Sequence, residues 1–322
     1  MAVFTPVSGA EARGYLEAYD LGRLQALTPI AEGVENTNYR LETTAGRFVL
    51  TLFEHRTRAD ALPFCLGLTQ HLASRGYPAP RPMPDRAGNW IGRLNGRPAS
   101  IIEWREGDWL RTPGLDDQRT AGRALAQLHL AAADFDGQRT NPVGPAVWRD
   151  LADRCASVAE GEDRCMLQRL EQALAEMVNR SLNYLPEGPV HADYFPDNIL
   201  FLNGAVSGVI DFYFACVDTL AYDLAIALNA WGFDVNGRAV PAAIAAFLTG
   251  YESVRPLSPA ERAALPDLGA RAVVRFTLTR LHDRLLASPD ALVTAKDPVP
   301  FLRRLDYWRE AARSSVAVAA AS

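Results

Sequence analysis

Residues 190–201 read VHADYFPDNILF, which places His191, Asp193 and Asn198 in the spacing H-x-D-x-x-x-x-N. A carboxylate at Asp193 can accept the proton of an attacking hydroxyl, and the amide oxygen of Asn198 is a hard ligand of the kind that magnesium prefers. The pattern therefore indicates phosphoryl transfer. The alternative is a turn in which both side chains only cap the backbone.

A second carboxylate follows thirteen residues after Asn198. The stretch V-I-D-F puts Asp211 at the end of a short apolar segment, 206–210, beyond the turn Asn203-Gly204. Two oxygen ligands at neighbouring strand ends, close to the proposed base, predict a magnesium site with Asn198 and Asp211. The alternative for Asp211 is a buried structural carboxylate paired with an arginine, and the hairpin spacing argues against it.

The part of the chain before residue 105 is predicted to be rich in strands. Ser8 and Glu11 have the spacing of a capping box, which opens a helix reaching to about Tyr19. Thr57 can cap a second helix, and Gly76 ends it. The strands are expected at residues 24–31, 38–43, 47–54, 89–94 and 99–104.

The chain changes character after Trp104. A polar connector over 105–114 is followed by mostly helical patterning. The expected helices span residues 115–133, 147–159, 163–184, 221–230, 240–254, 259–287 and 298–312. We therefore predict an α+β, two-lobed protein-kinase-like fold: a small β-rich nucleotide-binding lobe over 1–104, including the hinge, and a larger helical catalytic and substrate lobe over 105–322.

Composition is that of an ordinary globular protein, with 48% hydrophobic and 22% charged residues. The net charge of −5 gives no reason to expect a nucleic-acid or membrane partner. No secretory signal or membrane-spanning run is present, and four cysteines without CxxC spacing suggest reduced thiols in a cytoplasmic protein. Of the basic residues all but one are arginine, and the single lysine is Lys296.

Several motifs together resemble those of a known superfamily. The chain has D-F-Y in place of D-F-G and lacks both A-P-E and a G-x-G-x-x-G loop, which argues against a protein kinase. The stretches GVENTNYRLET, IIEWREG, GRALAQLHLAAADF and HADYFPDNILF resemble the aminoglycoside phosphotransferase and choline kinase superfamily. Within it, GVENTNY and DFYFACVDTLAYDLAIALNAW are most similar to the homoserine kinases. The resemblance implies ATP and Mg²⁺ as cofactors and L-homoserine as the phosphoryl acceptor, giving O-phospho-L-homoserine.

The resemblance also implies roles for individual residues. Asp193 is the implied catalytic base, His191 orients its loop, and Asn198 and Asp211 are the implied metal ligands. The implied nucleotide contacts are Val49 against the adenine ring and the hinge residues Glu103, Trp104 and Arg105.

This sequence departs from its relatives at the first lobe, where many of them pair a basic residue with a glutamate. The matching positions here are Thr51 and Cys65, which cannot form an ion pair. Phosphate contacts are expected instead from the loop between the first two strands, or from Arg40 or Arg47, and the alternative for the loop is a polar turn without a phosphate. The loop candidates are Gly33, Glu35, Asn36, Thr37 and Asn38.

Homoserine is a zwitterion, so its site should offer an acid for the ammonium and an arginine or amides for the carboxylate. The acceptor-contact candidates are Tyr213, Asp218, Asn229 and Trp231. Asp223 is interpreted as capping the start of its own helix. Arg275, Arg280 and Arg284 share one helical segment and are expected to have solvated or structural roles.

Two other functions stay open at this point. One is a kinase of the same fold for choline, an amino sugar or an aminoglycoside. Choline would require an aromatic cage, and the aromatic residues after Asp211 leave that open. The other is a nucleotide-binding pseudokinase without activity, against which the intact set of Asp193, Asn198 and Asp211 argues.

Overall fold

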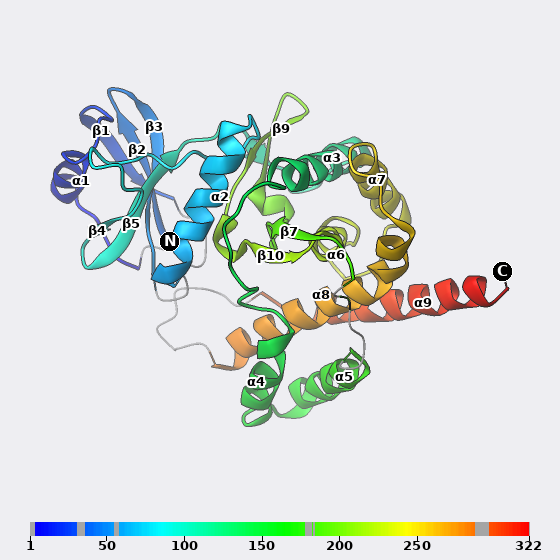
Figure 1. Ribbon diagram of the computed structural model, residues 1–322. Helices are drawn as coiled ribbons and strands as arrows, with labels where there is room; N and C mark the ends of the chain where they lie inside the picture. The colour runs from blue at the N-terminus through cyan, green and yellow to red at the C-terminus, as the bar shows by residue number, and fades with distance from the viewer. Residues whose placement is uncertain are drawn as a thin grey trace.

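The computed structural model describes residues 4–30, 36–54, 58–177, 182, 184–286 and 296–321, with the backbone alone for 314–321. It shows a β-sheet region formed by the N-terminal part of the chain and a larger, mainly helical C-terminal part (Figure 1). The α+β, two-lobed kinase-like fold class predicted from the sequence is confirmed. The division of domains at residues 104 and 105 stays a prediction.

The N-terminal part is an antiparallel sheet with one face covered by helix α1 (Gly9–Leu16). The predicted capping box opens this helix, with the Glu11 N–H donating to Ser8 Oγ at 3.3 Å. Leu50 and Leu52 point into the core beneath α1. The sheet order is β1-β2-β3-β5-β4, with β1 Leu24–Pro29, β2 Thr37–Thr43, β3 Gly46–Leu52, β4 Gly92–Leu94 and β5 Arg97–Glu103.

The opposite face of this sheet is turned toward the helical part. Side chains alternate across a strand, so Val49 and Thr51 of β3 lie on the face away from Leu50. Asn38 on β2 is opposite Thr51 and shares its face. Phe53, just after β3, packs edge-on against Tyr213 with ring centroids 5.1 Å apart. The two parts of the molecule therefore meet next to the residues that follow Asp211.

Helix α2 (Leu62–Ser74) connects the sheet to the main core, because Cys65, Leu68 and Leu72 pack there. Its N-cap differs from the prediction, since a short 3₁₀ turn at Ala59–Ala61 precedes the helix and Thr57 lies outside the described residues. The C-terminal end agrees with the sequence, because Gly76 takes a φ of 77°.

The helical part is built around α6 (Leu220–Trp231), which is buried over almost its whole length. Helices α3 and α7 pack closely at Gly122, where an added Cβ would lie 2.1 Å from the Phe247 carbonyl oxygen. The remaining helices lie around this centre (Figure 1). They are α3 Leu115–Ala131, α4 Pro145–Ala156, α5 Gly161–Met177, α7 Pro241–Glu252, α8 Pro259–Leu286 and α9 Val299–Ala321.

Two small sheets hold the loops at the centre of the molecule. β8 (Ile199–Leu202) and β9 (Ala205–Val209) form the predicted hairpin. The sequence did not predict three further strands, because each has only two to four residues and no clear alternation. These strands are β6 (Asp108–Trp109), which pairs with β8, and β7 (Glu187–Val190), which pairs with β10 (Cys216–Thr219).

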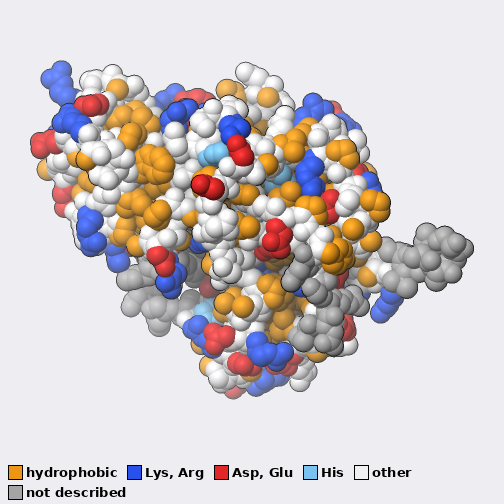
Figure 2. Space-filling model, viewed as in Figure 1, with side chains coloured by type: hydrophobic (Ala, Val, Ile, Leu, Met, Phe, Trp, Pro, Cys, Tyr) orange, Lys and Arg blue, Asp and Glu red, His pale blue; other side chains and the backbone are white. Residues whose placement is uncertain are grey.

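The face of the molecule in Figure 2 shows no large patch of one charge. Basic and acidic side chains are interspersed on the face shown in Figure 2. Within the described part of the chain, every helix is too short or too polar to cross a bilayer.

Candidate active site

The loop between β7 and β8 carries Asp193 and Asn198, and one side chain fastens its two ends. The Asn198 Nδ2 group donates to the Asp193 carbonyl oxygen at 2.9 Å and to Asp193 Oδ2 at 3.2 Å. Because the amide nitrogen faces Asp193, the amide oxygen of Asn198 faces away from it. A buried amide held in this way presents its oxygen in a fixed direction, as a metal ligand requires.

His191 connects this loop to the backbone that follows β9 and precedes Asp211. The Asp193 N–H donates to His191 Nδ1 at 3.2 Å, and His191 Nε2 lies 2.9 Å from the Ile210 carbonyl oxygen. Since a carbonyl can only accept, His191 is the neutral tautomer with its proton on Nε2. Burial lowers the pKa of His191 and favours this neutral form. The resemblance had implied that His191 orients the loop, and these contacts are the physical basis for that role.

Asp211 stands at the end of the β8–β9 hairpin in a left-handed backbone conformation. The Ile210 N–H donates to the Asn198 carbonyl oxygen at 3.0 Å. The two candidate metal ligands, Asn198 and Asp211, therefore lie on neighbouring backbone segments that are joined by a hydrogen bond. Asp211 has φ 63° and ψ 60° and an exposed side chain. Asp tolerates this conformation better than most residues.

Asp223 holds the backbone just before Asp193. Its Oδ1 accepts the Ala192 N–H at 2.8 Å, and its Oδ2 accepts the His191 N–H at 2.9 Å and contacts His129 Nε2 at 3.1 Å. Asp223 was expected to cap the amides at the start of its own helix, and this was wrong. Its carboxylate accepts instead from the amides of His191 and Ala192, in the loop that carries Asp193. Burial alone would raise the pKa of Asp223, but the bonds from His129 and His191 outweigh it and lower the pKa.

Arg275 of α8 holds the carbonyl side of Ala192, the residue whose N–H donates to Asp223. Its Nη1 donates to the Ala192 carbonyl oxygen at 2.6 Å, and the side chain is only 2% exposed. Burial raises the pKa of Asp193, although the positive charge of Arg275 opposes the shift. A carboxylate with a raised pKa is a better proton acceptor near neutral pH.

The donor set suits magnesium. Asn198 and Asp211 offer oxygen atoms, and the described residues contain no group of three or more His, Cys, Asp or Glu side chains that could cage a metal. Magnesium often keeps several waters and is bound by one or two carboxylates together with substrate phosphates. These residues therefore fit a magnesium–nucleotide complex better than a tightly held structural metal.

The predicted adenine site lies where β5 leads into the linker, next to the start of β3. Val49 is half-buried and is opposite Ile102 in the sheet, which gives an apolar surface. Glu103 ends β5, and Trp104 follows it, half-buried. The Arg105 guanidinium donates twice to the Ser207 carbonyl oxygen, at 2.7 and 3.0 Å. Arg105 thus ties the linker to β9 through its side chain.

The residues expected to hold phosphate are only partly in a loop. Gly33 and Glu35 lie outside the described residues, and Thr37 and Asn38 begin β2. The Thr37 hydroxyl is buried and donates to Glu54 Oε1 at 2.9 Å. Thr37 therefore offers no free hydroxyl, which corrects its expected place in a phosphate-binding loop.

The neighbouring asparagines also bond to the sheet. Asn36 Oδ1 accepts the Glu54 N–H at 3.2 Å, and Asn38 Oδ1 accepts the Thr51 hydroxyl at 2.8 Å. Asn38 and Thr51 lie on the face turned toward the helical part. Asn38 is thus the better placed of the two to approach a nucleotide.

Arg139 was missed by the sequence reasoning. Its Nη1 donates to the carbonyl oxygens of Tyr213 and Ala215, both at 2.7 Å, and lies 3.1 Å from Cys65 Sγ. It comes from the segment between α3 and α4, where an arginine in a polar stretch gives no sequence signal. The guanidinium fixes the turn that immediately follows Asp211.

Two of the four acceptor-contact candidates lie on the turn and the strand that follow Asp211. Tyr213 faces the sheet, where its ring packs against Phe53. Asp218 is half-buried on β10, and its Oδ2 accepts the Asn141 amide at 2.7 Å. Burial raises the pKa of Asp218, although the bond from Asn141 opposes the shift.

The other two candidates are core residues, which the structure corrects. Asn229 is fully buried, donates to the Ala225 and Gly269 carbonyls, and accepts Trp308 Nε1–H at 3.0 Å. Trp231 is 3% exposed and donates to the Tyr194 carbonyl oxygen at 3.0 Å. Neither side chain is available to a bound molecule, and both brace the helices behind the catalytic loop.

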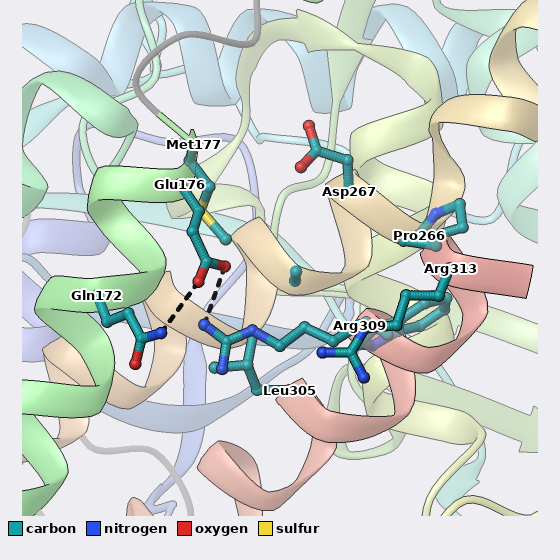
Figure 3. A pocket seen from close by; sticks show the side chains of 11 residues that line it. Gln172, Glu176, Met177, Pro266, Asp267, Leu305, Arg309 and Arg313 are labelled. Carbon is teal, nitrogen blue, oxygen red and sulfur yellow. Dashed lines mark hydrogen bonds and ion pairs between the residues drawn. The ribbon is translucent and has the colours of Figure 1, made fainter. Parts of the chain in front are cut away.

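A cavity of about 510 Å³ lies elsewhere, between α5, α8 and α9 (Figure 3). Its floor includes Met177 and Leu305, and Glu176 at its edge pairs with Arg309 at 2.9 Å and accepts from Gln172 at 3.3 Å. None of its lining residues belongs to the loops of Asp193 or Asp211. The ion pair joins α5 to α9, so this region serves helix packing.

The two-lobed fold, with Asp193, Asn198 and Asp211 on adjoining loops, defines the class of kinase-like phosphotransferases. The model of the phosphotransferase enzyme family matches residues 26–257, and the chain belongs to this family. It is 46% identical over 310 residues to the homoserine kinase of Brucella anthropi, covering 96% of this chain and 95% of that one. It is 47% identical over 311 residues to that of Methylobacterium radiotolerans, covering 97% of each. At this identity and coverage the chain belongs with the homoserine kinases inside the family.

Solved structures agree on the fold. A microcompartment-associated aminopropanol kinase matches with a TM-score of 0.71 at 18% identity, covering 96% of this chain and 98% of that one. An amicoumacin kinase, solved with AMP-PNP, Ca²⁺ and amicoumacin, matches with a TM-score of 0.67 at 15% identity, covering 95% of each chain. Identity this low supports the shared architecture and not a shared acceptor.

Proposed function

We propose that this protein transfers the terminal phosphoryl group of magnesium ATP to the side-chain hydroxyl of L-homoserine, giving O-phospho-L-homoserine. The observation that carries the proposal is the identity of 46–47% with two homoserine kinases over nearly the full chain. The site is compatible with it, because a base and two oxygen ligands lie on adjoining loops. Neither choline nor an aminoglycoside has support of this kind.

In the proposed reaction Asp193 accepts the proton of the acceptor hydroxyl. The hydroxyl oxygen forms a bond to the terminal phosphorus as the bond from that phosphorus to the oxygen of the leaving ADP breaks. Asn198, through its bond to Asp193 Oδ2, holds the carboxylate in the orientation that receives the proton. Magnesium, bound through Asn198 and Asp211, would neutralise charge on the phosphates.

Phosphoryl transfer depends mainly on placement, so the contacts that fix Asp193 matter as much as the base itself. Asp223 and Arg275 bind the N–H and the carbonyl of Ala192, respectively. His191 adds the link to Ile210. The catalytic loop is therefore held from three sides before any substrate arrives.

The nucleotide is proposed to lie between the β3–β5 face and this loop. Val49 would contact the adenine ring, and the backbone of Glu103, Trp104 and Arg105 would hold its edge. Asn36 and Asn38, at the start of β2, are the proposed phosphate contacts, together with Gly33. Asp218 is the proposed acid for the ammonium of the acceptor, because its carboxylate is half-buried on β10, the strand that follows Asp211.

The test is a side-by-side assay of L-homoserine, choline, ethanolamine and kanamycin with magnesium ATP, following ADP formation. We expect L-homoserine to be the best acceptor by a wide margin. A much better turnover of choline or kanamycin would overturn the choice of acceptor and leave the kinase class intact. The absence of ADP with every acceptor would instead favour a pseudokinase.

A further inference from the structure

Four cations from α8, α9 and the segment just before α9 lie over a cluster of three phenylalanines beside the loop that carries Asp193. Phe276 lies between Phe195 and Phe301, with ring centroids 5.0 and 5.3 Å away. Phe195 is two residues beyond Asp193. The cations that lie over these rings are Arg275, Arg280, Lys296 and Arg304, at 3.9 to 5.8 Å from a ring centroid. Positive charge is thus concentrated beside the base, on a side from which a nucleotide is not expected.

Two of these cations are buried and hydrogen-bonded to backbone carbonyls, so they cannot reach a ligand. Arg275 donates to the Ala192 carbonyl and is only 2% exposed. Arg304 donates to the Asn229 carbonyl and is 8% exposed. Both are supports of the surrounding backbone.

Lys296 already has an acidic partner, Asp197. Its Nζ lies 3.2 Å from Asp197 Oδ2, which makes an ion pair on the outer side of the catalytic loop. This pair neutralises the lysine where it would otherwise attract an anion.

Arg280 differs from the other three. It is half-buried, stacks 4.4 Å from the Phe301 ring centroid, and donates only a long bond, 3.4 Å, to the Asp297 carbonyl oxygen. In the described part of the chain no carboxylate lies within 4 Å of its guanidinium. The carboxylates of Asp193, Asp197 and Asp297 are nonetheless close enough to act on its charge. A half-buried guanidinium that forms no ion pair with a described carboxylate, near the proposed base, is a ready site for a carboxylate.

We propose that Arg280 binds the carboxylate of the acceptor and so selects hydroxyl compounds that carry one. This inference rests on the proposed function, because it assigns one end of the zwitterion to a particular side chain. The planar guanidinium can hold a carboxylate through two parallel bonds, and Phe301 supports its flat face. An acceptor anchored there would have its hydroxyl directed toward Asp193.

An anion bound to Arg280 would also reduce the repulsion between two neighbouring positive charges. Arg280 and Arg304 stack on the same ring, Phe301, and the positive charge of Arg280 contributes, after burial, to lowering the pKa of Arg304 to about 9. A bound carboxylate would relieve the repulsion between these two guanidinium groups. The cluster is therefore better suited to an acceptor that carries a carboxylate than to choline or an amino sugar, which bring positive charge without one.

The test compares two acceptors that differ only in the carboxylate: L-homoserine and 3-aminopropan-1-ol. Arg280→Gln should raise the KM for L-homoserine about 10- to 100-fold, as expected for the loss of charge-assisted hydrogen bonds. The kcat/KM for 3-aminopropan-1-ol and the KM for ATP should stay within about twofold of the parent. Arg280→Lys should recover part of the loss, because it restores the charge without the planar fork.

Arg284→Gln is the matched control. Arg284 lies one turn further along α8 and pairs with Asp163 of α5, so its removal should leave both acceptors unaffected. A parental KM for L-homoserine in Arg280→Gln, or an equal loss with both acceptors, would overturn the inference while the proposed function stands.

If the parent enzyme does not phosphorylate L-homoserine, the proposed function fails. If it then prefers another acid-bearing alcohol, that compound and its decarboxylated analogue test Arg280 in the same way, whereas a preference for an acceptor without a carboxylate overturns both.

Discussion

The carboxylate of Asp223 accepts the N–H of Ala192 at 2.8 Å, so a buried charge fixes the residue that immediately precedes the proposed catalytic base, Asp193. Ala192 has a φ of 61°, a left-handed conformation that a β-carbon disfavours. Asp223 holds the N–H of this peptide and Arg275 holds its carbonyl oxygen. The strain is thus maintained by two charged partners that the surrounding core prevents from moving.

Asp193→Asn should lower turnover by about 10²- to 10⁴-fold, because general-base catalysis acts mainly in the transition state. Nucleotide affinity should change little, since the amide keeps the shape of the side chain. Stopped assays of ADP formation and equilibrium nucleotide titration measure the two quantities. Asp197→Asn, an exposed residue of the same loop, is the control and should remain within a few-fold of the parent. Near-normal turnover of Asp193→Asn would exclude the proposed base.

Removal of the second proposed ligand should separate metal binding from folding. Asp211→Asn keeps a residue that tolerates a φ of 63° but replaces a carboxylate oxygen with an amide. We expect magnesium-dependent nucleotide binding to weaken strongly in this variant and to disappear in Asp211→Ala, while thermal unfolding stays cooperative. If both variants bind magnesium nucleotide like the parent, the metal is held elsewhere.

Thr51→Ala should reduce activity less than threefold. The resemblance matches Thr51 to a position where many relatives are expected to carry a basic residue, but Thr51 donates to Asn38 Oδ1 and carries no charge. Asn38→Ala should instead raise the KM for ATP several-fold, because Asn38 is the proposed phosphate contact. Steady-state kinetics at varied ATP distinguish the two. A large loss from Thr51→Ala with none from Asn38→Ala would reverse this account of the phosphate side.

Much of this arrangement could be predicted from the sequence, because its signals are local. The spacing of Asp193 and Asn198, the strand before Asp211 and the capping box of Ser8 each involve fewer than ten consecutive residues. Strands β7 and β10 could not be predicted, since they are stable only as a pair of distant four-residue segments. Tertiary contact, and not local propensity, makes them strands.

The acceptor side was the least predictable part for a similar reason. Asn229 and Trp231 follow Asp211 closely in the sequence, but α6 carries them into the core. Arg280 was expected from the sequence to be solvated or structural, and only the packing of α8 brings it near Asp193. Which polar residues of a helix reach a site depends on packing between distant elements.

Arg139 illustrates the same limit and gives a prediction of its own. Arg139→Met should raise the magnesium concentration that gives half-maximal activity, because the carbonyls of Tyr213 and Ala215 would lose the guanidinium that fixes the turn after Asp211. The KM for the acceptor should change little, which a magnesium titration at saturating acceptor can check. Arg149→Met, at an exposed position on α4, is the control. An unchanged magnesium requirement in Arg139→Met would show that the turn holds its shape without it.

The charge of Asp223 also makes the stability of the protein depend on pH. Because hydrogen bonds lower its pKa below the ordinary 3.8, the ionised carboxylate stabilises the native state at neutral pH, and this stabilisation is lost as the pH falls through the lowered value. Asp223→Asn should decrease the free energy of unfolding by about 3 kcal/mol at pH 7, since it removes one partner of a buried charged cluster. The difference from the parent should be constant between about pH 7 and 5 and should narrow only below about pH 4, where the parent also loses the charge. Urea unfolding across this range measures it, with Asp153→Asn, an exposed residue, expected within about 0.5 kcal/mol of the parent throughout. A difference that grows as the pH falls would mean that the carboxylate of Asp223 is protonated in the native protein, and the charge that holds Ala192 would have to come from elsewhere.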